Sequence, residues 1–191
     1  MSVAEQPVSV PTADRQRHVP EPVSVGLAFL LAAACFLHFG VTAEAFIGAI
    51  FVVVLVVLSV IDYERGLLPN RIVLPATGVI LALQLIFFPD RALEYILATL
   101  GAGLVFMLAY LTYRSGLGQG DVKFALLLGA GLGQGVVLGI FVGMFAAGVA
   151  GVILIARHGV GARKRTIPLG PFLAFGAVVS LLTHGAAFVS F

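Results

Sequence analysis

Charged residues divide this sequence into long apolar runs, and that division restricts what the chain can fold into. Each run is long enough for the roughly 17–25 residues that an α-helix needs to cross a hydrocarbon core of about 30 Å. The runs are continuously apolar rather than alternating, which favours membrane helices over barrel strands. The runs without Asp, Glu, Lys or Arg are residues 22–43, 45–61, 72–89, 95–113, 124–156 and 166–191.

Composition excludes a water-soluble domain. Hydrophobic residues make up 60% of the 191 residues and charged residues 10%, whereas soluble domains carry about 25% charged residues. Cys35 is the one cysteine, which excludes a disulfide within the chain and a cysteine-based zinc site. We expect no metal, no cofactor and no nucleic-acid partner. We expect the lipid bilayer to surround the protein.

The fold class that follows is all-α, a polytopic helical bundle with about seven transmembrane spans. Residues 1–22 are rich in proline and polar residues and predict a flexible cytosolic tail, and residues 23–191 form the membrane domain. Residues 121–156 are too long for one crossing, so the glycines at 129, 131, 133 and 135 indicate a break. The predicted spans are 24–41, 44–62, 71–88, 92–113, 117–133, 135–156 and 169–190.

The basic residues support that count. With the N-terminus in the cytosol and the C-terminus outside, ten of the eleven Lys and Arg residues face the cytosol and Arg91 faces out, as the positive-inside rule requires. We therefore expect a multi-pass protein of a prokaryotic cytoplasmic membrane.

Two acidic residues suggest chemistry. Asp62 ends the second span and Asp121 begins the fifth, and the two spans between them return the chain to the same membrane face. Charges near a bilayer are costly and by default mark function or a wet cavity. Both could instead be interfacial helix caps. Asp121 suits a helix N-terminus, whereas Asp62 at a helix C-terminus opposes the dipole.

Paired acids from separate helices suggest aspartic-protease chemistry, in which one carboxylate activates water and the other, protonated, polarises the scissile carbonyl. Gly118 and Gly120 directly precede Asp121 in the sequence Gly-Gln-Gly-Asp. Their bare backbone would let an extended substrate approach Asp121 closely.

Three motifs together resemble those of the type IV prepilin peptidases, over roughly residues 44–191. The motifs are Asp62 followed by Leu68-Pro69-Asn70, then Gly118-Gln119-Gly120-Asp121-Val122-Lys123, and finally Pro168-Leu169-Gly170-Pro171-Phe172-Leu173-Ala174.

The resemblance implies that Asp62 and Asp121 are the catalytic pair of an endopeptidase that removes the short basic leader from prepilin or pseudopilin-like precursors at the cytosolic face. It also implies supporting or substrate-binding roles for Gly118, Gly120, Lys123, Pro69, Asn70, Pro168, Gly170 and Pro171. Bifunctional members carry an insert with two Cys-x-x-Cys pairs that is associated with N-methylation. This sequence has no such insert, so we expect a peptidase-only form.

Alternatives remain open at this stage. Lys123 is either a positive-inside anchor or a cation that stabilises a nearby carboxylate. The presenilin type shares Gly-x-Gly-Asp but has Pro-Ala-Leu where this chain has Pro168-Leu169-Gly170. A small proton-coupled transporter would place its acids near the midplane, and a non-catalytic subunit of a secretion machine would tolerate their loss.

Overall fold

The computed structural model describes residues 19–112, 118–158 and 168–187, and within these ranges the chain forms helices and no strand. Seven α-helices occupy the predicted spans to within a few residues. They are α1 (Glu21–Phe39), α2 (Ala43–Arg65), α3 (Asn70–Phe87), α4 (Ala92–Thr112), α5 (Gln119–Leu132), α6 (Val136–His158) and α7 (Gly170–Ala187), with the short 3₁₀ helices η1 (Pro89–Arg91) and η2 (Gly133–Gly135).

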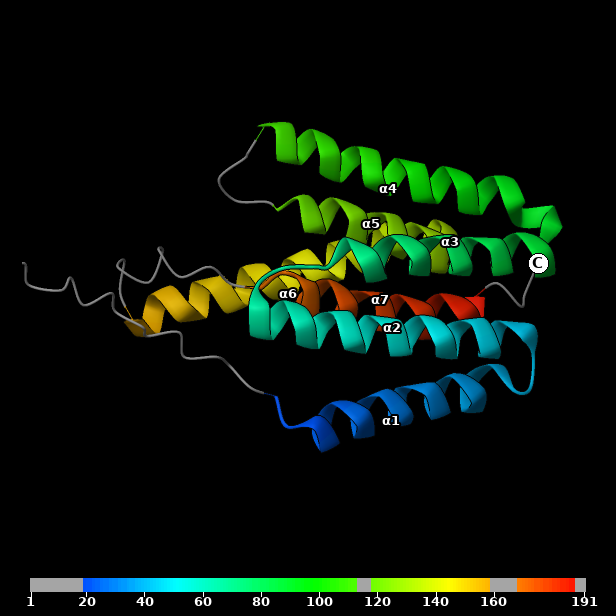
Figure 1. Ribbon diagram of the computed structural model, residues 1–191, viewed down its shortest axis with the longest axis horizontal. Helices are drawn as coiled ribbons and strands as arrows, with labels where there is room; N and C mark the ends of the chain where they lie inside the picture. Colours follow the sequence, from blue (N-terminus) through cyan, green and yellow to red (C-terminus); the bar gives the residue numbers. More distant parts are fainter. Residues whose placement is uncertain (1–18, 113–117, 159–167, 188–191) are drawn as a thin grey trace, which may run out of the picture.

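The helices run alternately up and down, side by side, as an elongated bundle (Figure 1). The end of α2 and the starts of α3, α5 and α7 therefore lie at one end of the bundle, on the left in Figure 1. The fold class is confirmed as a helical membrane bundle. The predicted tail extends to residue 22, whereas α1 already begins at Glu21, with Pro22 in its first turn; residues 1–18 lie outside the described range.

Five stretches of the described chain are long and apolar enough to cross a membrane, and one of them joins α5, η2 and α6 in 39 residues. Gly133 interrupts that stretch with a φ of +54°, a backbone conformation that residues other than glycine rarely adopt. The chain turns back there, so α5 and α6 run in opposite directions (Figure 1). The break predicted from the glycine run is thus present, while the number of crossings and the direction of insertion stay predictions.

The short helix α5 is the centre of the bundle, because it contacts α2, α3, α4, α6 and α7. Its buried residues extend from Phe124 to Gly131, and Phe51, Leu55 and Leu173 from α2 and α7 belong to the same core. The outer surfaces of the bundle carry exposed apolar side chains, including Phe29 of α1 and Val152 of α6. An apolar outer surface is what a bilayer requires of a protein that spans it.

Small residues bring the last two helices together. A Cβ atom added to Gly143 of α6 would lie 2.8 Å from the Cα of Leu173 in α7, and one added to Gly176 would collide with the backbone of Gly139 and Gly143. Side-chain bulk is thus excluded where α6 and α7 cross, a common way for helices to associate in lipid. This packing fixes the position of α7, whose first residue reaches the site described next.

Candidate active site

Asp62 lies in the last turn of α2, with 6% of its surface exposed. Its Oδ2 atom accepts a hydrogen bond of 2.9 Å from the backbone N–H of Gly170, the first residue of α7. A Cβ atom on Gly170 would come within 2.7 Å of the same oxygen. The carboxylate of Asp62 therefore faces the N-terminus of another helix, where the helix dipole favours negative charge.

Asp121 is the third residue of α5 and folds back on the start of its own helix. Its Oδ2 atom accepts a hydrogen bond of 2.9 Å from the backbone N–H of Gly118. Its own N–H donates to the carbonyl oxygen of Gly118 at 3.1 Å. Gly118 is extended, with φ −87° and ψ 155°, and serves as the N-cap residue. Asp121 thus caps α5 through its Oδ2 atom, as the alternative interpretation expected.

The two acids lie in helix turns at the same end of the bundle. Asp62 is in the last turn of α2 and Asp121 in the first turn of α5, and α2 ends where α5 begins (Figure 1). Two carboxylates that share a site repel each other when both are ionised, and such groups hold protons as a pair. Such a pair can supply a general base and a general acid at once.

The turn between α2 and α3 packs against the start of α5. A Cβ atom on Gly120 would lie 3.0 Å from the Cβ of Leu68, so the space beside Gly120 is occupied by the Leu68 side chain. Lys123 donates a hydrogen bond from Nζ to the Oδ1 atom of Asn70 at 2.6 Å. The first and second sequence motifs are therefore in direct contact.

Most of the residues selected from the sequence gather around Asp62 and Asp121. Gly118 and Gly170 each donate a backbone N–H to one of the acids, and Pro69 is the N-cap residue that begins α3. Pro171 is the second residue of α7 and points into the cavity described next, whereas Pro168 lies two residues before that helix.

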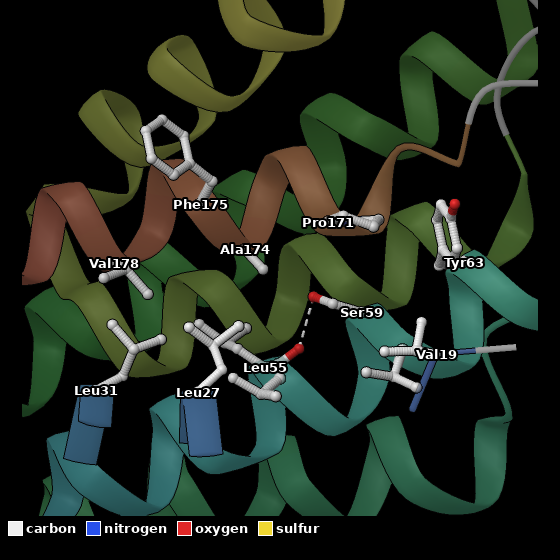
Figure 2. A pocket seen from close by; sticks show the side chains of 12 residues that line it. Val19, Leu27, Leu31, Leu55, Ser59, Tyr63, Pro171, Ala174, Phe175 and Val178 are labelled. Atoms are coloured by element: carbon white, nitrogen blue, oxygen red, sulfur yellow. Dashed lines mark hydrogen bonds between the residues drawn. The ribbon is translucent and has the colours of Figure 1, made fainter. Parts of the chain in front are cut away.

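An apolar groove beside Asp62 was not predicted from the sequence. It has a volume of about 460 Å³ and lies between α1, α2 and α7 (Figure 2). Ser59 and Tyr63, within one turn of Asp62, line its wall on α2, and the Ser59 hydroxyl donates to the Leu55 carbonyl oxygen at 2.7 Å. A search for apolar and small residues within one turn of Asp62 would have found part of this wall. The other lining residues are Val19, Leu27, Leu31, Leu55, Val56, Val60, Pro171, Ala174, Phe175 and Val178.

A separate polar cluster occupies the opposite end of the bundle. The Glu94 carboxylate receives two hydrogen bonds of 3.0 Å from Arg91 and one of 3.1 Å from the backbone N–H of Gln134. The Arg91 guanidinium also lies 5.5 Å from the ring centre of Tyr95. Glu94 thereby satisfies a backbone donor at the break between α5 and α6. Among the described residues, no group of three or more His, Cys, Asp or Glu side chains is placed to hold a metal ion.

Comparison with known proteins agrees with the three motifs. A family model described as "Type IV leader peptidase family" matches residues 49–156. The chain is 29% identical to a prepilin leader peptidase/N-methyltransferase of Bacillus subtilis, over 84% of this chain and 64% of that protein. Identity to the protein of the same name from Pseudomonas putida is 32%, over 84% of this chain and 57% of that protein.

The chain thus spans about three fifths of the length of these two relatives. A shorter relative is leader peptidase HopD of Salmonella typhimurium, which is 33% identical over 64% of this chain and 83% of its own length. No solved structure matches the chain significantly. The family model covers both Asp62 and Asp121, and the chain belongs to the type IV leader peptidase family.

Proposed function

We propose that this chain is an aspartic-type endopeptidase that removes the leader from type IV prepilin-like precursors. The observation that supports the proposal is that Asp62 and Asp121 come from separate helices whose ends lie at one end of the bundle. The names of the relatives, which include prepilin leader peptidases, agree with this substrate.

The reaction needs one proton shared between two carboxyl groups. The ionised carboxylate takes a proton from water as the oxygen attacks the scissile carbonyl, and the protonated partner donates its proton to the carbonyl oxygen. Collapse of the tetrahedral intermediate breaks the C–N bond, the proton taken from water goes to the leaving amine, and one hydroxyl of the intermediate returns its proton to the partner carboxylate. Protons held by the pair are coupled, so the two roles belong to the pair rather than to a named residue.

The groove between α1, α2 and α7 is lined by residues that neighbour Asp62 in the sequence of α2. Tyr63 follows Asp62 directly in α2, and Pro171 follows the Gly170 that binds Asp62. A groove with almost wholly apolar walls binds apolar segments best, because burial of apolar surface contributes about 25 cal/mol per Å². We infer that an apolar stretch of the precursor lies there while its scissile bond reaches the acids.

The proposal includes the setting of the enzyme. The reaction takes place at the cytosolic face of the membrane in this proposal. An orientation with the N-terminus in the cytosol supports it, because ten of the eleven basic residues lie inside in that orientation. The transporter and the secretion-subunit alternatives have no comparable support, because the chain belongs to a peptidase family.

The test replaces each acid by its neutral isostere. Asp62→Asn, Asp121→Asn and the double variant are compared with wild type for cleavage of a purified prepilin in liposomes. Asp90→Asn is the matched control, because Asp90 is an exposed acid in η1 at the other end of the bundle. Each single change removes one general acid–base group and is expected to lower the cleavage rate by about 10²–10⁴-fold.

The double variant is expected to be scarcely slower than either single variant, because groups that act as a unit are not additive. Substantial cleavage by either single variant would contradict the two-acid mechanism and leave that residue as a helix cap. Membrane insertion and expression are measured for every variant, so that lost activity is not confused with lost protein.

A further inference from the structure

Two contacts join the chain segments that follow the acids. Asn70 comes eight residues after Asp62, and Lys123 comes two residues after Asp121. The Lys123 ammonium donates to the Asn70 side-chain oxygen at 2.6 Å. Directly beside this bond, Leu68 packs against Gly120 at 3.0 Å from the position of a Cβ atom. The start of α3 is thereby tied to the start of α5.

Lys123 makes a contact that neither interpretation made from the sequence included. Its ammonium is directed at the Asn70 side chain, in a short charge-assisted hydrogen bond at the exposed surface. Bonds of this kind are roughly twice as strong as neutral ones.

The Lys123–Asn70 hydrogen bond, called the tie below, connects the segments that carry the two acids. Asp62 is on α2, which passes through the turn with Gly66 at φ +63° into Leu68 and Asn70. Asp121 and Lys123 are within one turn of α5. The bond from Asn70 to Lys123 therefore connects the two short segments, residues 62–70 and 121–123, that carry the carboxyl groups.

We propose that Lys123 and Asn70 are positioning residues, and that their hydrogen bond holds the Asp62 and Asp121 carboxyl groups at their working separation. The inference rests on the proposed peptidase function. The effect is on geometry, so it falls on the chemical step more than on substrate binding. Displacements of about 1 Å at reacting groups can lower rates by about 100-fold.

The kinetic test uses variants that distinguish a tie from a charge. Lys123→Met and Asn70→Leu each break the hydrogen bond and are expected to lower kcat by roughly 10- to 100-fold, with KM nearly unchanged. The double variant is expected to match the singles, because both remove one interaction. Arg71→Met is the matched control, since Arg71 is an exposed cation in the same turn of α3.

The exchange variant Asn70→Lys with Lys123→Asn restores a donor and an acceptor while moving the cation away from position 123. Recovery of most of the lost kcat by the exchange supports the tie. Equal losses in Arg71→Met and Lys123→Met would overturn it in favour of an interfacial anchor. A loss confined to Lys123→Met, with Asn70→Leu fully active, would overturn it in favour of a direct electrostatic role.

A second measurement needs no activity and separates this inference from the proposed function. Leu68→Cys and Gly120→Cys are combined in a Cys35→Ser background. The short approach at this contact is near the Cβ–Cβ distance of about 3.5–4.5 Å in disulfides. Oxidative cross-linking in membranes reports how closely the two segments are held.

Cross-linking is expected to slow several-fold when Lys123→Met is added and to stay unchanged with Arg71→Met. An unchanged rate with Lys123→Met would overturn the tie, whatever the enzyme assay gives. Slowed cross-linking in a chain that cleaves no precursor would support the tie and count against the peptidase function.

Discussion

The contact between Gly170 and Asp62 offers a sharp test of the site, because Gly170→Ala changes one atom position and keeps the backbone donor. The added Cβ would stand 2.7 Å from Oδ2 of Asp62 and 3.1 Å from its Cβ and Cγ atoms. Ordinary contact begins at 3.4 Å, so the oxygen or the start of α7 must move by about 0.7 Å.

The cost of that movement divides between stability and catalysis. Overpacking a filled site costs about 1–3 kcal/mol, and alanine in place of glycine in a helix returns up to about 1 kcal/mol. The variant should therefore still fold. A catalytic carboxyl group displaced by a sizeable part of 1 Å is expected to lose up to about 100-fold in rate. We expect kcat to fall by about 10- to 100-fold, with KM little changed.

The assay is cleavage of a purified prepilin in liposomes, with Gly101→Ala as the control. Gly101 lies in α4, and a Cβ atom there would meet nothing within 4 Å. It carries the same gain in helix propensity without the contact. If Gly170→Ala cleaves at the wild-type rate, the close approach of α7 to Asp62 has no part in catalysis and the reasoning fails.

Three further predictions concern the stability of the bundle, the apolar groove and the product of cleavage. Arg91→Leu leaves Glu94 without its cationic partner and should lower the free energy of unfolding by about 1–3 kcal/mol. Unfolding is followed during heating by the reaction of the buried Cys35 thiol with a fluorescent maleimide. An unchanged midpoint temperature of unfolding would show that the ion pair contributes nothing. Leu31→Trp narrows the apolar groove and should raise KM several-fold, whereas Leu30→Trp, next to it but outside the groove lining, should not; equal values for both would remove the groove from substrate binding. With this chain as the added enzyme, mass spectrometry of the cleaved precursor should show a free N-terminal amine, and a methyl group that depends on this chain would refute the peptidase-only expectation.

The helices themselves could be predicted from the sequence. Six runs without charge, the longest of them divided at its glycines, predicted seven helices, and α1 to α7 occupy these stretches. The glycines around position 133 predicted the break that the structure places at η2. The common location of Asp62 and Asp121 followed from counting two helices between them, because each crossing reverses the direction of the chain.

The face that each helix turns toward its neighbours could not be predicted in the same way. Helices of a membrane bundle are apolar on the lipid side as well as inside, so the hydrophobic pattern does not mark the buried face. The burial of α5 from Phe124 to Gly131 is decided by the five helices around it. The sequence showed a short helix and gave no sign that it is the centre of the bundle.

The contacts of the site depended on tertiary structure for a related reason. Three sequence motifs placed Asp62, Lys123 and Gly170 on the list of candidates, but the motifs do not state which atoms meet. The hydrogen bond from Gly170 to Asp62 joins residues 108 positions apart, and the bond from Lys123 to Asn70 joins residues 53 positions apart. The sequence alone determined which residues could do the chemistry and at which end of the bundle they lie. Their partners were decided by the rotation and depth of each helix, which close packing between several helices sets together.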